Sequence, residues 1–60
     1  MIPQDPVILL SYINTQLRDN YPSLDSLAEG LDISPEALED IVNKLRGISY
    51  NYDSSQNKFI

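Results

Sequence analysis

The sequence predicts an α+β domain in which three short helices precede a C-terminal β-hairpin. Apolar residues recur with the helical period of about 3.6 in three stretches between residues 6 and 46. From Ile48 onwards they alternate with polar residues, which is the period of a strand with one buried face. Each helical stretch is also preceded by a residue type that starts helices. No repeat or linker interrupts the 60 residues, so we expect one domain over residues 1–60.

The first helix is expected from Pro6 to about Asp19. Asp5 can cap it, and proline suits the first helical position because it has no N–H to leave unpaired there. One stripe of this helix is apolar and should face the core; it contains Leu9, Leu10, Ile13 and Leu17.

The second helix is expected to follow the N-cap Ser23 and to end near Gly30. Its apolar residues share one side and are Leu24, Leu27, Ala28 and Leu31. Asp32 stands in the following turn, where glycine is common in helix-turn-helix proteins. We therefore expect a looser turn at this point.

The third helix is expected to follow the N-cap Ser34, to have Pro35 in its first turn and to run to about Arg46. Its apolar stripe contains Ala37, Leu38, Ile41, Val42 and Leu45. Gly47 occupies the place where a left-handed residue commonly ends a helix. Asp40 and Lys44 are spaced to form an i, i+4 ion pair.

The hairpin is expected to begin at Ile48 and to turn over residues 54–57. Asn57 suits the left-handed conformation that such turns need. With this loop, Tyr52 lies opposite Phe59 and Asp53 opposite Lys58, which gives an aromatic pair on one face and a charge pair on the other. A slip of one residue would lose both pairs.

Two resemblances follow from these elements. Residues 24–45 resemble a helix-turn-helix, and the preceding helix and the following hairpin complete the element order of a winged helix. The whole chain is also similar to a family of short bacterial proteins catalogued as domain of unknown function 4250. The stretches that carry this similarity are Pro3-Gln4-Asp5-Pro6, Leu9-Leu10-Ser11, Asn14, Leu17-Arg18-Asp19, Ser23-Leu24-Asp25 and Tyr50-x-Tyr52-Asp53-x-x-x-Asn57-x-Phe59. This resemblance implies a bacterial, cytoplasmic protein and supplies no activity.

The residue inventory argues against catalysis. The chain has no histidine and no cysteine, so it lacks the usual general bases, nucleophiles and soft metal ligands. Carboxylates such as Glu39 and Asp40 are expected on an exposed helix face, where nothing perturbs them. We therefore expect no enzyme activity, no cofactor and no small-molecule ligand. The absence of cysteine fits a reducing compartment, and the short apolar runs do not predict a membrane span, so we expect a cytoplasmic protein.

The charge of the chain separates its candidate partners. Nine acids against four bases give a net charge of −5, which repels phosphate backbones. The exposed face of the third helix, which would read DNA in a helix-turn-helix, is acidic and carries Glu36, Glu39, Asp40 and Asn43. Sequence therefore favours a non-catalytic protein-interaction domain, and a DNA-binding transcriptional regulator or an accessory subunit of one is the alternative.

Two apolar features are further candidates for protein contact. Ile8 and Tyr12 form an i, i+4 pair opposite the core stripe of the first helix, unless the hairpin or Met1-Ile2 folds over them. Phe59 and Ile60 end the hairpin at what we expect to be an unprotected apolar edge. Either feature would allow self-association into a homodimer, and the acidic face would attract a basic partner.

Overall fold

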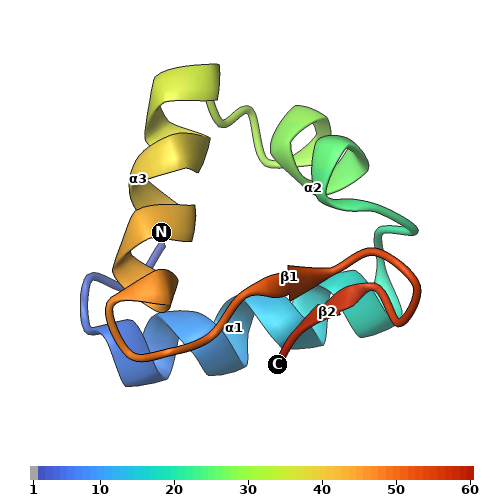
Figure 1. Ribbon diagram of the computed structural model, residues 1–60. Coiled ribbons are helices and arrows are strands. Elements are labelled where there is room, and N and C mark those ends of the chain that lie inside the picture. The colour runs from blue at the N-terminus through green and yellow to red at the C-terminus, as the bar shows by residue number, and fades with distance from the viewer. Residues whose placement is uncertain (1) are drawn as a thin grey trace.

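The polypeptide folds into three helices and a two-stranded antiparallel hairpin, as the sequence predicts. The computed structural model describes residues 2–60. Its elements in chain order are α1 (Pro6–Asp19), α2 (Leu24–Gly30), α3 (Pro35–Arg46), β1 (Tyr52–Asp53) and β2 (Lys58–Phe59). Figure 1 shows the hairpin running along α1, and α2 joined to α3 by a short turn at the end of α3 that lies away from α1. The α1 helix contacts α2, α3 and β2, and so it supports the rest of the fold.

The three helix starts are those predicted from the capping residues. The carboxylate of Asp5 accepts hydrogen bonds from the N–H groups of Val7 at 2.9 Å and Ile8 at 3.2 Å. The hydroxyls of Ser23 and Ser34 each accept the N–H three residues further on, at 3.1 and 3.2 Å. These bonds satisfy amide groups that have no partner inside the helix.

The core lies where the apolar faces of the three helices meet the hairpin. Its buried side chains are Leu9, Ile13, Leu17, Leu27, Ile41, Leu45 and Phe59. The predicted stripe of α1 is therefore confirmed, although Leu10 is half-buried. The stripe of α3 is narrower than predicted, because only Ile41 and Leu45 are buried and Ala37 is exposed.

The turn between α2 and α3 is tight, and the expectation of a looser turn at Asp32 is wrong. Asp32 adopts the left-handed conformation, with φ 56°, that glycine would otherwise supply. The N–H of Ile33 donates to the carbonyl of Ala28 at 2.8 Å, and that of Asp32 to Glu29 at 3.2 Å. These are the two bonds of a Schellman motif, which closes a helix end.

The same motif ends α3, but at a different residue from the one predicted. Gly47 is right-handed, with φ −61°, and Ser49 is left-handed, with φ 69°. The N–H of Tyr50 donates to the carbonyl of Leu45 and that of Ser49 to Arg46, both at 2.9 Å. The chain therefore coils for two more residues before it reverses, and the strand predicted from Ile48 begins only at Tyr52.

The predicted register of the hairpin is confirmed. Tyr52 lies opposite Phe59, with ring centroids 5.5 Å apart, and Asp53 lies opposite Lys58. Asp53 does not form an ion pair with Lys58, because its carboxylate bonds instead within the turn, to the N–H and hydroxyl of Ser55 at 2.9 and 2.6 Å. Asn57 is left-handed as predicted, with φ 55°.

In the part of the chain from residue 2 to 60, no helix has both the length and the apolar content needed to cross a membrane.

Candidate functional site

The side-chain amide of Asn14 closes the outer edge of β2. Its Nδ2 donates to the carbonyl of Phe59 at 3.1 Å, and its Oδ1 accepts the Phe59 N–H at 2.8 Å. Asn51 and Ile60 exchange both of their peptide hydrogen bonds, at 2.9 and 3.0 Å, so the peptide groups of Phe59 must point away from β1. Asn14 thus takes the place of a neighbouring strand, and the expectation of an unprotected edge at Phe59 is wrong.

A second asparagine fixes the turn of the hairpin to the end of α1. The Nδ2 of Asn57 donates to the carbonyls of Leu17 at 3.1 Å and Tyr21 at 2.9 Å. Its Oδ1 accepts from the Tyr52 hydroxyl at 2.7 Å. Asn57 and Asn14 therefore have structural roles that need no ligand, and they account for two of the positions in the family-like stretches.

The predicted apolar candidates do not form one exposed surface. Phe59 is 1% exposed and belongs to the core, and Tyr12 is half-buried and packs against the core. Ile8 and Ile60 are 58% and 49% exposed. The alternative was that Met1-Ile2 folds over Ile8 and Tyr12. Met1 lies outside the described residues, and Ile2 packs against the core beside α3. Ile8 and Tyr12 consequently do not act as an exposed pair.

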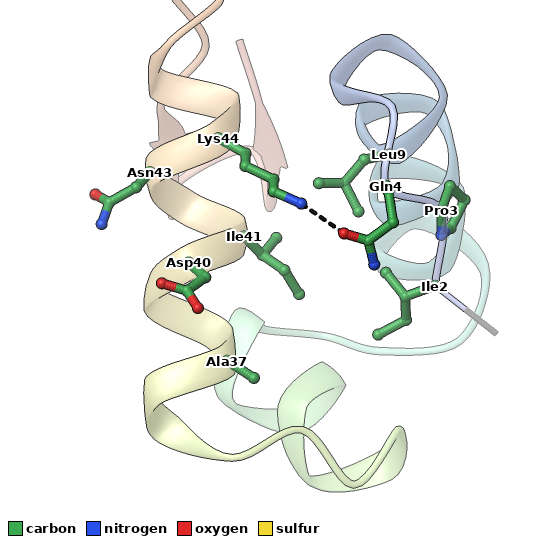
Figure 2. A pocket seen from close by; sticks show the side chains of 9 residues that line it. All are labelled: Ile2, Pro3, Gln4, Leu9, Ala37, Asp40, Ile41, Asn43 and Lys44. Atoms are coloured by element: carbon green, nitrogen blue, oxygen red, sulfur yellow. Dashed lines mark hydrogen bonds between the residues drawn. The ribbon is translucent and has the colours of Figure 1, made fainter.

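A first hollow lies between the N-terminal segment and α3 (Figure 2). It has a volume of about 520 Å³, an apolar base that includes Leu9 and Ile41, and Asp40 at its rim. Lys44 reaches across it, and its Nζ donates to Oε1 of Gln4 at 2.7 Å. The predicted Asp40–Lys44 ion pair is absent from residues 2–60, because Lys44 makes this bond instead. The contact joins residues 40 positions apart, so local spacing gave no signal for it.

Two adjoining hollows lie on the other flank of α3. Their volumes are about 590 and 420 Å³, and both are lined by Pro35 and Leu38. We call the two hollows together the α2–α3 surface. Its apolar residues are Ala28, Ile33, Pro35, Leu38 and Val42, and its polar and charged residues are Asp25, Glu29, Asp32, Glu39, Asn43 and Arg46.

Leu38 is the larger of the two apolar side chains that line both hollows of this surface. The sequence places it in the core stripe of α3, but it is half-buried and is not among the side chains that pack against the core. Since Leu38 lines both hollows, it joins the part lined by α2 to the part lined by α3. Leu38 is thus an apolar side chain that the fold leaves partly exposed.

The nine carboxylates of the chain fall into two groups. Three accept hydrogen bonds: Asp5 caps α1, Asp19 pairs with its neighbour Arg18, and Asp53 shapes the hairpin turn. The other six form no side-chain hydrogen bond or ion pair within residues 2–60; they are Asp25, Glu29, Asp32, Glu36, Glu39 and Asp40. All six lie between residues 24 and 46, together with two bases, so this segment has a net charge of −4.

The predicted acidic face of α3 is therefore divided by the fold. Glu39 and Asn43 line the α2–α3 surface, whereas Asp40 lines the hollow beside the N-terminal segment. Asn43 also borders that hollow, but Figure 2 shows its side chain pointing away from the N-terminal segment. Glu36 is exposed and lines neither site. Sequence reasoning missed Asp25, Glu29, Asp32 and Leu38, because it treated α3 without its neighbour α2.

The cations of the chain do little to offset this charge. Arg46 is the one base on the α2–α3 surface, and its guanidinium makes a long contact of 3.4 Å with Asn43. Arg18 pairs with Asp19 at 2.8 Å on the far end of α1. Its hydrogen bond lowers the pKa of Asp19, and the same pair raises the pKa of Arg18.

Possible metal ligands do not gather in the part of the chain that the structure describes. No group of three or more carboxylates converges on a point where a metal ion would be held. The pKa of Asp53 is lowered first by the Ser55 hydroxyl and then by the Ser55 N–H. This shift belongs to the turn and does not indicate a reactive site.

Comparison with known proteins assigns the chain to a family. No curated protein and no solved structure matches it. A family model with the description "Domain of unknown function (DUF4250)" matches residues 3–59. This match spans every helix and strand described above, and it confirms the resemblance seen in the sequence. The chain therefore belongs to the DUF4250 family.

Proposed function

We propose that this protein is a non-catalytic protein-interaction domain and that it binds its partner through the α2–α3 surface. The observation that carries the proposal is Leu38, a half-buried leucine outside the core with uncompensated carboxylates around it. An apolar centre with a polar rim is the usual composition of a protein-binding patch. The lack of histidine and cysteine supports a role without catalysis.

The cellular compartment forms part of the same proposal, and composition and charge support it. The chain has no cysteine, which suits a reducing compartment, and its net charge of −5 disfavours adsorption to anionic lipid. We accordingly propose a cytoplasmic protein of a bacterium. Self-association through α1 or through the hairpin edge has little support, because Tyr12 of α1 and Phe59 of β2 are engaged with the core.

DNA binding is the second candidate, and it rests on the order of α2, turn, α3 and hairpin, which is that of a winged helix. Charge argues against it. A DNA reader gains much of its affinity from Lys and Arg that neutralise phosphates, whereas the exposed side of α3 presents Glu36, Glu39 and Asp40. We expect no retardation of duplex DNA in a mobility-shift assay at low salt, and strong salt-sensitive retardation would reverse the order of the two candidates.

Affinity capture of a partner from the native bacterium tests the proposal. The full chain should retain a protein, and Leu38→Asp should lose it because a charge would replace the apolar centre. Val7→Asp is the matched control, since Val7 is 67% exposed on α1 and lies outside the α2–α3 surface. If Leu38→Asp and Val7→Asp are both folded and Leu38→Asp captures the partner as efficiently as wild type does, the α2–α3 surface is removed from the proposal.

A further inference from the structure

The arrangement of charge around Leu38 specifies the chemistry of the partner. The acids come from both sides: Asp25 and Glu29 from α2, and Glu39 from α3. Within residues 2–60 no lysine or arginine pairs with any of them. A partner that covers Leu38 must therefore bring its own cations, or it would bury carboxylates without compensation.

The shape of the patch favours a helix as the occupant. An amphipathic helix presents one apolar stripe with its polar side chains on both flanks, which matches an apolar centre with acids on both sides. An extended strand points its alternate side chains away from such a surface, so fewer of its cations would meet these acids. We propose that the α2–α3 surface docks a cationic amphipathic helix of another protein, with an apolar residue on Leu38 and Lys or Arg beside Asp25, Glu29 and Glu39. This inference rests on the proposed function and makes it specific.

The two other occupants to be considered fit less well. A second copy of this chain would bring its own six uncompensated carboxylates toward the same acids. The hollow beside the N-terminal segment does not share the excess of negative charge, because its lining contains one acid, Asp40, and one base, Lys44, which donates to Gln4 across it. The α2–α3 surface is thus distinguished by both its apolar centre and its unbalanced charge.

A synthetic peptide provides a direct test. The probe is a helix of about 14 residues, because a helix rises about 1.5 Å per residue and the domain is 23 Å across. It carries leucine along one stripe and lysine elsewhere. One control peptide has the same composition in scrambled order, and another has glutamate in place of lysine. Binding to the full chain is measured by isothermal titration calorimetry at physiological salt.

A pair of neighbouring substitutions separates docking from long-range attraction. Glu39→Lys and Asp40→Lys change the net charge equally, but Glu39 lines the α2–α3 surface and Asp40 does not. We expect Glu39→Lys to weaken binding of the leucine–lysine peptide about tenfold, and Asp40→Lys to weaken its binding less than about twofold. Leu38→Ala should also weaken binding of this peptide about tenfold, in a domain that circular dichroism shows to be folded, since Leu38 is half-buried and lies outside the core.

The result expected is tight binding of the amphipathic lysine peptide, weaker binding of the scrambled peptide and none of the glutamate peptide. Equal binding of the scrambled peptide, equal effects of the two lysine substitutions, or no binding at all would overturn the inference. A concentration-dependent dimer that Leu38→Ala abolishes would overturn it too, by showing a second copy on the surface. Capture of a partner without any helix preference would leave the proposed function standing and remove only this inference.

Discussion

Asn14 and Phe59 pair through two hydrogen bonds, in which the side-chain amide of Asn14 both donates to and accepts from the peptide groups of Phe59, at 3.1 and 2.8 Å. The amide of an asparagine has the donor and acceptor of a peptide unit, so one side chain on α1 completes the edge of β2. The contact holds the hairpin against the helix and buries the ring of Phe59.

Replacing Asn14 with leucine should destabilise the fold by about 1–3 kcal/mol, because both peptide groups of Phe59 would lose their partner in a partly buried place. Urea unfolding followed by circular dichroism measures the change. Thr15→Leu is the control, as Thr15 is the exposed neighbour on the same helix and should change stability by no more than about 0.5 kcal/mol. Equal stability of the two variants would contradict the role given to Asn14.

Substitutions of Asn57 separate its backbone role from its side-chain role. Asn57→Gly keeps the left-handed turn but loses the bonds to Leu17, Tyr21 and Tyr52, and should cost about 1–3 kcal/mol. Asn57→Val loses these bonds and also resists positive φ, which adds about 1–2 kcal/mol. The melting temperature should fall from wild type to Asn57→Gly, and fall further in Asn57→Val. A glycine variant as stable as wild type would show that the three bonds contribute nothing.

Ser49→Gly should stabilise the protein by about 0.5–1 kcal/mol, because Ser49 is held left-handed at the end of α3. Ser11→Gly makes the same change in a helical position of α1 and should destabilise it by about 0.5–1 kcal/mol. Thermal unfolding of both variants tests whether the two substitutions change stability in opposite directions. Loss of stability in Ser49→Gly would mean that the chain reverses elsewhere, for example at Gly47.

The pKa of Asp53 should rise toward its ordinary value of 3.8 when its main hydrogen-bond partner is removed by Ser55→Ala. Because the folded-state pKa is lowered, the contribution of Asp53 to stability is present above the ordinary pKa and is lost as the pH falls through the lower, folded value. The stability difference between wild type and Ser55→Ala should therefore shrink in acid. Carbon-13 NMR titration of the Asp53 carboxyl measures the pKa, and the same titration midpoint in both proteins would refute the assignment.

Local signals in the sequence predicted much of the fold. Asp5, Ser23 and Ser34 cap helices through bonds that span two or three residues, and the hairpin register follows from the length of its turn. Contacts between distant residues were not predictable in this way. Asn14 and Phe59 are 45 positions apart, and nothing near Asn14 indicates that a strand will lie beside it.

The candidate site was predicted in part, for a similar reason. The acidic character of α3 is visible in the sequence, but its division between two flanks depends on where α2 and the N-terminal segment pack. Leu38 has the spacing of a core residue, and it lies in the first turns of α3, so periodicity cannot separate a buried leucine from one that is partly exposed. The left-handed residue after α3 also differs from the predicted one. Glycine is the residue most often found in this conformation, but Ser49 adopts it here and Gly47 does not.

Site-specific photo-crosslinking in living cells tests the central claim most directly. A photoreactive amino acid in place of Asn43, which lines the α2–α3 surface, should form a covalent adduct with another protein. The same amino acid in place of Thr15, which is exposed on α1, should not. An adduct with nucleic acid at position 43, or protein adducts at position 15 alone, would contradict the claim that this surface binds a protein.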